Sequence, residues 1–133
     1  MNNEIEAQYV IIGDALVGVI GREFDAAWIY AEVKEDVAGV SIFYRGSDDL
    51  VHHRPPDLRL ADAIYGLWEM FTTAGLASWS CATFSLDGHG AFRLELGYDD
   101  FDHDGSTIMS RREEWIRRHL GDAVIESQAS RSG

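Results

Sequence analysis

The chain has 133 residues, the usual size of a single domain, and 46% of them are hydrophobic, which is enough for one core. Its formal net charge is −12, from 23 acidic and 11 basic side chains. Such a surface repels phosphates and attracts basic proteins, which argues against nucleic acid as a direct ligand, although acidity also serves solubility alone. We expect one domain over residues 1–126 and a small, polar, flexible tail over residues 127–133.

The cysteine content and the first residues of the chain indicate the cellular compartment in which the protein is expected. The single Cys81 has no partner for an intrachain disulfide, which fits a reducing environment. The N-terminal residues are acidic rather than basic, and Asp14 interrupts the apolar run that follows them. We therefore expect a cytoplasmic protein without a signal peptide or a membrane span.

The spacing of apolar residues predicts an alternation of helices and strands. Three stretches repeat apolar residues every three to four positions, as helices do, and five shorter stretches alternate with the period of two typical of strands. The expected elements are, in chain order, helix 3–21, strand 27–34, turn 37–39, strand 40–45, turn 46–49, strand 50–54, helix 57–74, two strands within 78–101, and helix 106–120.

This order predicts an α+β domain: an antiparallel sheet of about five strands, with the helices packed mainly on one face. The other face retains large aromatic side chains that a solvated face does not need, so either the last helix or a partner must cover part of it. These side chains are Trp28, Tyr30, Phe43 and Trp79. On the last helix, the expected polar side consists of Arg111, Arg112, Arg117 and Arg118.

The chain is organised around the hairpin within residues 78–101. Ala82, Phe84 and Leu86 share one face of its first strand, and the second strand repeats the pattern. Asp87 and two glycines supply the reversal. Beyond the hairpin, four aspartates fall within six residues beside two aromatic rings, and Tyr98 is expected to anchor the strand end. The aspartates are Asp99, Asp100, Asp102 and Asp104.

Several of these motifs, in this order, resemble the YezG/EsaG-like family of bacterial immunity proteins. The resemblance covers about residues 27–121 and departs from the family at the hairpin turn, where His89-Gly90 replaces a short link containing lysine. It implies an antitoxin that binds and silences a nuclease toxin with a basic active domain. The motifs are Trp79, Leu86-Asp87-Gly88, Tyr98-Asp99-Asp100-Phe101, Arg112, Trp115 and His119-Leu120-Gly121.

An acidic and aromatic surface is our hypothesis for the toxin-binding site, since carboxylates on strand ends can replace phosphates at toxin Arg and Lys side chains. The alternative for the acidic stretch is a solvated loop that begins the last helix. The candidate residues are Asp99, Asp100, Asp102, Asp104, Trp28, Tyr30, Asp48 and Asp49.

Two other functional classes remain open, a non-catalytic adaptor domain and a calcium- or metal-dependent enzyme. Residues 100–105 match the opening of a calcium loop, but the twelfth position, which should be a bidentate Glu, is Arg111. His52 and His53 are adjacent on a strand and point to opposite faces, so they do not chelate one metal together. No motif supplies an activated nucleophile, and we expect neither enzymatic activity nor a cofactor.

Overall fold

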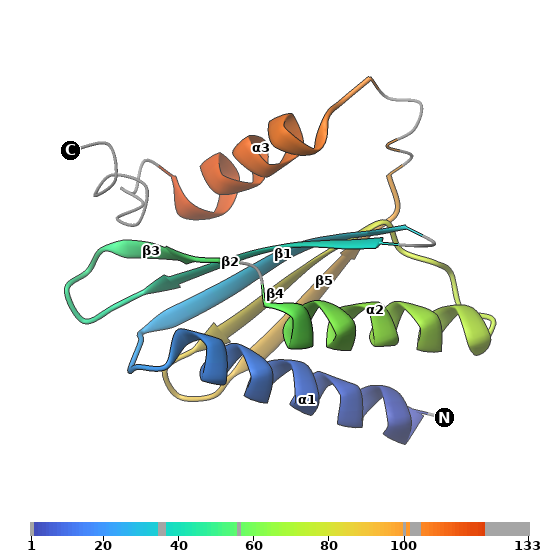
Figure 1. Ribbon diagram of the computed structural model, residues 1–133, viewed down its shortest axis with the longest axis horizontal. Helices are drawn as coiled ribbons and strands as arrows, with labels where there is room; N and C mark the ends of the chain where they lie inside the picture. Colours follow the sequence, from blue (N-terminus) through green and yellow to red (C-terminus); the bar gives the residue numbers. More distant parts are fainter. Residues whose placement is uncertain (1, 35–36, 56, 100, 102–104, 122–133) are drawn as a thin grey trace.

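A computed structural model describes residues 2–34, 37–55, 57–99, 101 and 105–121. Its elements are α1 (Asn2–Ile20), β1 (Ala26–Lys34), β2 (Val37–Arg45), β3 (Val51–Arg54), α2 (Leu58–Thr73), β4 (Cys81–Asp87), β5 (Phe92–Gly97) and α3 (Ile108–Leu120). The strands form one antiparallel sheet in the order β3-β2-β1-β4-β5. Figure 1 shows α1 and α2 side by side under one face and α3 alone on the other. The α+β fold expected from the sequence is confirmed.

One predicted turn is wrong. Residues 37–39 belong to β2, and Val37 already pairs with Lys34 across the hairpin. The sequence suggested a turn because glycine weakens a strand, but glycine is also found in strands where another part of the protein approaches the backbone closely. A Cβ atom on Gly39 would lie 3.3 Å from the Cδ1 atom of Ile108, at the beginning of α3. Gly39 therefore makes room for the helix rather than reversing the chain.

The face of the sheet that α1 and α2 cover, called here the near face, holds the main hydrophobic core. Ile29, Phe84 and Leu67 are completely buried in it, together with the apolar stripes of both helices. Trp79 also lies here, edge-on to Phe71 of α2, so its predicted place on the opposite face is wrong. Because Trp79 precedes β4, strand alternation did not determine its direction.

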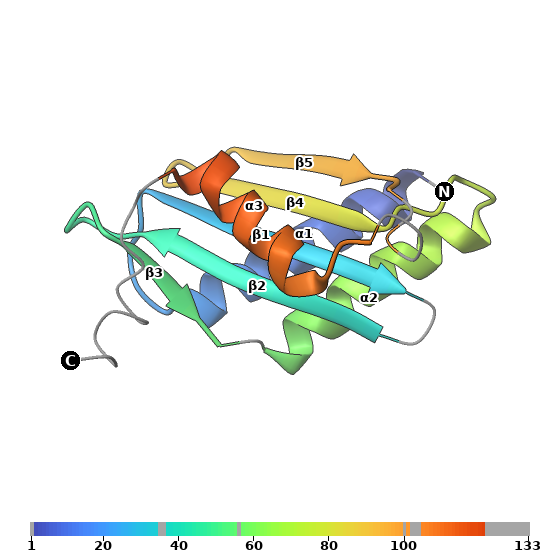
Figure 2. The same cartoon turned by 90° about the horizontal axis from the view of Figure 1, so that it is seen from above.

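The face under α3, called the far face, buries a smaller cluster of residues. Tyr30, Phe43, Val51, Trp115 and Leu120 form this cluster. Figure 2 shows α3 lying across this face of the sheet. The helix thus covers Tyr30 and Phe43, two of the aromatic side chains that the sequence left without a partner. A capping box between Thr107 and Ser110 fixes where α3 begins.

Two further expectations about this region are corrected. Tyr98 is 57% exposed and follows β5, so it does not anchor the strand end. Arg111 and Arg112 turn toward the sheet, and only Arg117 and Arg118 are exposed. The helical period placed all four arginines opposite the apolar stripe, but α3 has a narrow stripe, and long side chains on its flanks reach the sheet. None of the helices in the described part of the chain is long and apolar enough to cross a membrane.

Candidate functional site

A charged pair attaches α3 to the middle of the sheet. Glu32 of β1 accepts hydrogen bonds from Arg111, Nε to Oε2 and Nη2 to Oε1, both at 2.7 Å. The Tyr30 hydroxyl donates to the same Oε2 at 2.6 Å, and Arg111 Nη1 donates to Ser106 Oγ at 2.7 Å. Both charged side chains are largely buried. A bidentate geometry with further hydrogen bonds is what offsets the desolvation of such a pair.

Stacked rings surround this pair. Trp115 stacks on Tyr30 and Phe43, with ring centroids 5.6 and 5.4 Å apart. Its indole Nε1 donates to Thr83 Oγ1 at 2.8 Å. Arg112 lies over the Phe43 ring and donates to Ser41 Oγ at 3.0 Å, and burial lowers the pKa of its guanidinium. These contacts fix both the position and the rotation of α3.

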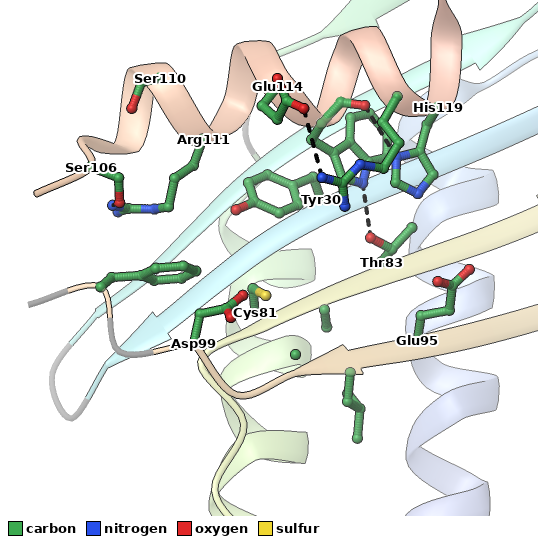
Figure 3. Close-up of a pocket in the computed structure, with 16 residues that line it drawn as sticks. Tyr30, Cys81, Thr83, Glu95, Asp99, Ser106, Ser110, Arg111, Glu114 and His119 are labelled. Carbon is green, nitrogen blue, oxygen red and sulfur yellow. Dashed lines mark hydrogen bonds and ion pairs between the residues drawn. The ribbon is translucent and has the colours of Figure 1, made fainter. Parts of the chain in front are cut away.

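A groove remains beside α3, above β4 and β5, with a volume of about 460 Å³ (Figure 3). Cys81 lies at its base, where burial first, and then the carboxylates of Asp99 and Glu32, raise the pKa of the thiol. A raised pKa keeps the thiol protonated at neutral pH, which is the opposite of what a cysteine nucleophile needs.

Several other polar groups of the groove already serve the helix. His119 Nδ1 donates to the Trp115 carbonyl at 3.1 Å, and the Ser110 hydroxyl belongs to the capping box. Ser106 accepts from Arg111. Part of its polar lining therefore holds α3 in place, while Glu95 and Asp99 are exposed at its border.

Three segments converge at the end of the sheet where β1 and β5 begin: residues 22–25, 46–50 and 87–90. Asp25 N–H donates to the Arg45 carbonyl at 2.8 Å, and Gly88 N–H donates to the Asp25 carbonyl at 2.9 Å. A Cβ atom at residue 88 would lie 2.9 Å from the Phe24 carbonyl oxygen, so only glycine permits this approach. The three segments border a hollow of about 1040 Å³.

Two aspartates at this end are fixed by their own turns. Asp48 Oδ1 accepts from Leu50 N–H at 3.0 Å, and its Oδ2 lies 2.9 Å from His52 Nε2. Asp87 Oδ1 accepts from the N–H groups of His89 and Ala91, at 2.8 and 2.9 Å. These backbone hydrogen bonds lower the pKa of both carboxyls, which favours their ionised form.

We call this region the turn-end surface. Glu23, Asp25 and Asp49 are exposed beside the two fixed aspartates. Asp49 has a φ of 67°, a left-handed conformation that Asp tolerates better than most residues. The surface consists of Glu23, Asp25, Asp48, Asp49 and Asp87.

Among the residues that the structure describes, those predicted to bind a partner do not lie together. Trp28 is half-buried near the turn-end surface, with the Arg45 guanidinium 5.5 Å from its ring centre. Tyr30 is only 8% exposed and stacks on Trp115, so α3 rather than open solvent lies over it. Strand alternation gave its face correctly but did not show that α3 lies over it.

The aspartates divide between opposite ends of the sheet. Asp48 and Asp49 follow Arg45, which pairs with Ala26, whereas Asp99 follows Gly97, whose partner Cys81 pairs with Glu32. From Ala26 to Glu32 the strand spans about 20 Å. Asp99 is exposed and borders the groove; Asp100, Asp102 and Asp104 lie outside the described residues.

Sequence reasoning missed Glu23, Asp25 and Asp87 as members of this surface. Asp87 was interpreted only as a turn residue, and the other two precede a strand without any motif. Their proximity depends on the pairing of β1 with both β2 and β4. A count of acids at every expected strand end would have been the available signal.

Among the residues that the structure describes, no group of three or more His, Cys, Asp or Glu side chains is placed to hold a metal ion. The calcium-loop pattern at 100–105 falls mostly outside those residues. In comparisons with known proteins, no family model matches the chain, and no curated protein matches it.

Proposed function

We propose that this chain is a non-catalytic inhibitor of the immunity-protein type, which binds the basic nuclease domain of a toxin through the turn-end surface. The observation that carries the proposal is that five carboxylates from three segments lie at one end of the sheet, two of them fixed by backbone hydrogen bonds. The resemblance of several motifs to YezG/EsaG-like proteins supports the same function.

Fixed carboxylates suit an inhibitor of a phosphate-binding enzyme. A nuclease cleft presents Arg and Lys side chains to the phosphates of its substrate, and carboxylates can accept the same charge-assisted hydrogen bonds. Asp48 and Asp87 are already ordered by their turns, so binding costs little further side-chain entropy. The net charge of −12 would also steer a basic partner toward this surface.

Trp28 gives the same surface an aromatic neighbour. Its ring is half-buried under the Arg45 guanidinium, close to the start of β1. Partly exposed aromatic and arginine side chains are the groups that most often dominate binding energy at protein interfaces. The groove beside α3 is a weaker candidate because several of its polar side chains, those of Ser106, Arg111 and His119, are committed to holding the helix.

The test uses the variant Asp25→Asn/Asp49→Asn, which removes two exposed charges and keeps both side-chain shapes. We expect its affinity for the nuclease domain encoded beside this gene to fall about 10- to 100-fold, with slower association at low salt. Titration calorimetry and stopped-flow binding measure the two effects. A thermal melt close to that of the unchanged protein would show that the fold is preserved.

Two controls locate the interface. Asp62→Asn/Glu69→Gln makes the same change of charge on the exposed side of α2 and should leave affinity within about threefold. Asp100→Asn/Asp102→Asn tests the acidic stretch that begins with Asp99. Loss of binding only in Asp100→Asn/Asp102→Asn would place the interface at that stretch instead. If the nuclease stays active in the presence of excess protein, the proposed inhibitor function is wrong.

A further inference from the structure

Strand β5 is the last strand of the sheet, and its outer edge is open in the described structure. It pairs with β4 on one side, and no described strand pairs with the other (Figure 2). An open edge presents unpaired N–H and C=O groups and is a template for another strand. No proline or bulge interrupts residues 92–97.

The pairing with β4 shows which backbone groups point outward. Asp87 N–H donates to the Ala91 carbonyl at 3.0 Å, so this pair is a hydrogen-bonded one. Antiparallel ladders alternate, which directs the backbone of Arg93 and Glu95 toward β4 as well. The outward N–H and C=O groups therefore belong to Phe92, Leu94 and Leu96.

Side chains on β5 alternate in the same way. Phe92, Leu94 and Leu96 pack against the core of the near face, whereas Arg93 and Glu95 are exposed on the far face. The two opposite charges flank Leu94, at the middle of the strand. This arrangement is complementary to itself when the strand is turned by 180°.

We propose that a second copy of this chain pairs with β5 in an antiparallel ladder centred on Leu94. In that register Leu94 faces Leu94 of the other copy, Phe92 faces Leu96, and Arg93 faces Glu95. The outward backbone groups of all three apolar residues then find partners, and each Arg93 meets an opposite charge. This register pairs the outward backbone groups of all three residues within the strand, and the charges select it over the neighbouring registers.

Other registers lose one of these matches. A ladder centred on residue 93 or 95 places Arg93 opposite Arg93, or Glu95 opposite Glu95, and leaves the outward backbone groups of Leu96 or of Phe92 opposite a residue beyond the end of β5. Like charges directly opposite one another destabilise a strand pair. The pattern therefore fits a copy of the same strand better than an unrelated acidic or basic strand.

Helix α1 adds an apolar surface on the same side of the molecule. Val10 and Val17 are 62% and 47% exposed, and with Gly13 they line a shallow hollow of about 410 Å³ whose other wall includes Leu86 and Phe92. A second copy on β5 brings its own α1 to the same face of the joined sheet, next to this hollow. Burial of these valines favours association.

The overall charge opposes a dimer, since each copy carries −12. Repulsion between distant charges is screened beyond about 10 Å at 0.1 M salt, whereas adjacent Arg93 and Glu95 side chains are screened less. Association should therefore strengthen as salt rises from about 10 to about 150 mM. This dependence is opposite to that expected for a basic partner.

The test measures molecular mass by sedimentation equilibrium from about 1 to about 200 µM, a range that detects micromolar dissociation constants. The unchanged chain should approach twice the monomer mass of 14.9 kDa. Arg93→Glu and Glu95→Arg each place like charges opposite one another and should weaken the dimer at least about tenfold. The exchange variant Arg93→Glu/Glu95→Arg restores the pairing and should dimerise again.

A mixture gives the most specific result. The single variants Arg93→Glu and Glu95→Arg are complementary to each other, so an equimolar mixture should form a heterodimer when neither variant pairs with itself. Arg59→Glu and Glu69→Arg make the same changes of charge on exposed positions of α2 and should remain dimeric. An unchanged chain that stays monomeric at the highest concentration, or single variants that dimerise as tightly as it does, would overturn the proposal.

Discussion

The near face of the sheet buries almost only apolar side chains, whereas the far face buries a carboxylate, a guanidinium and a tyrosine hydroxyl among stacked rings. On the near face two helices contribute apolar stripes. The stabilisation there comes from the apolar area that is buried, and it does not require particular bond directions. On the far face α3 contributes only Trp115 and Leu120 as buried residues. The same sheet thus uses hydrophobic burial on one side and directed polar contacts on the other.

This difference separates two roles. Apolar burial supplies most of the folding free energy, and an apolar core tolerates substitutions that preserve its total side-chain volume. The pair of Glu32 and Arg111 adds little net stability but permits α3 to dock in one orientation only, because any other leaves a buried charge without its partner. We therefore expect the near face to unfold with the whole molecule and α3 to open locally.

The largest effect is expected from Phe84→Ala on the near face. Phe84 is completely buried on β4, and its truncation leaves a cavity that should lower the free energy of unfolding by about 3–5 kcal/mol. Chemical denaturation followed by circular dichroism and by tryptophan fluorescence should give one coincident transition. A loss below about 1 kcal/mol would show that Phe84 does not belong to the cooperative core.

A smaller and local effect is expected from Arg111→Met on the far face. The change leaves the Glu32 carboxylate without its bidentate partner and should lower the free energy of unfolding by about 2–3 kcal/mol. The loss stays below the full cost of a buried unpaired charge because α3 can undock locally and let water reach the carboxylate. Hydrogen exchange should show faster exchange in α3 and little change in β1 and β4.

The matched variant is Glu32→Gln/Arg111→Met, which removes both charges. It should recover about half of the lost stability or more, since no buried charge remains without a partner. A double variant as unstable as the single one would show that the lost packing of the Arg111 stem dominates. Protection lost equally in α3 and the near face would contradict local opening.

Strand alternation predicted most of the near face and also placed Tyr30 and Phe43 on the far face, but it did not predict the contact that holds α3 over them. The alternation that placed Ile29, Ala31 and Val33 inward depends only on the strand period, and the same holds for Phe84 on β4. The pair of Glu32 and Arg111 joins residues 79 positions apart, and no local pattern encodes such a contact. The third helix was expected, but its crossing over Tyr30 depends on that contact.

The candidate site was predictable only in part, for the same reason. Asp48 and Asp49 were selected because they occupy a turn after a strand, and the structure places them in one. Asp25 and Asp87 come from other turns and lie at the same end of the sheet only because β1 pairs with both β2 and β4. Sequence patterns identify turns one at a time, whereas the sheet order determines which turns are adjacent.

The smallest effect distinguishes the faces by pH rather than by size. Burial first, and then the Glu32 carboxylate, raise the pKa of the Tyr30 phenol above its usual value near 10. In the unfolded chain this phenol ionises near pH 10, so the stability that depends on its neutral form is complete below that pH and is lost as the pH rises further. Tyr30→Phe should cost about 1 kcal/mol at neutral pH, from the lost hydrogen bond to Glu32, and should reduce the loss of stability between about pH 10 and 11.5. Denaturant titrations at pH 7 and across that range measure both effects, with Tyr98→Phe as the control at an exposed position.

Some alkaline loss should persist in Tyr30→Phe, because burial also raises the pKa of Tyr9 and of Cys81. An alkaline loss of equal size in Tyr30→Phe and the unchanged protein would mean that α3 opens before Tyr30 ionises, so that the far face has already separated from the near face at that pH.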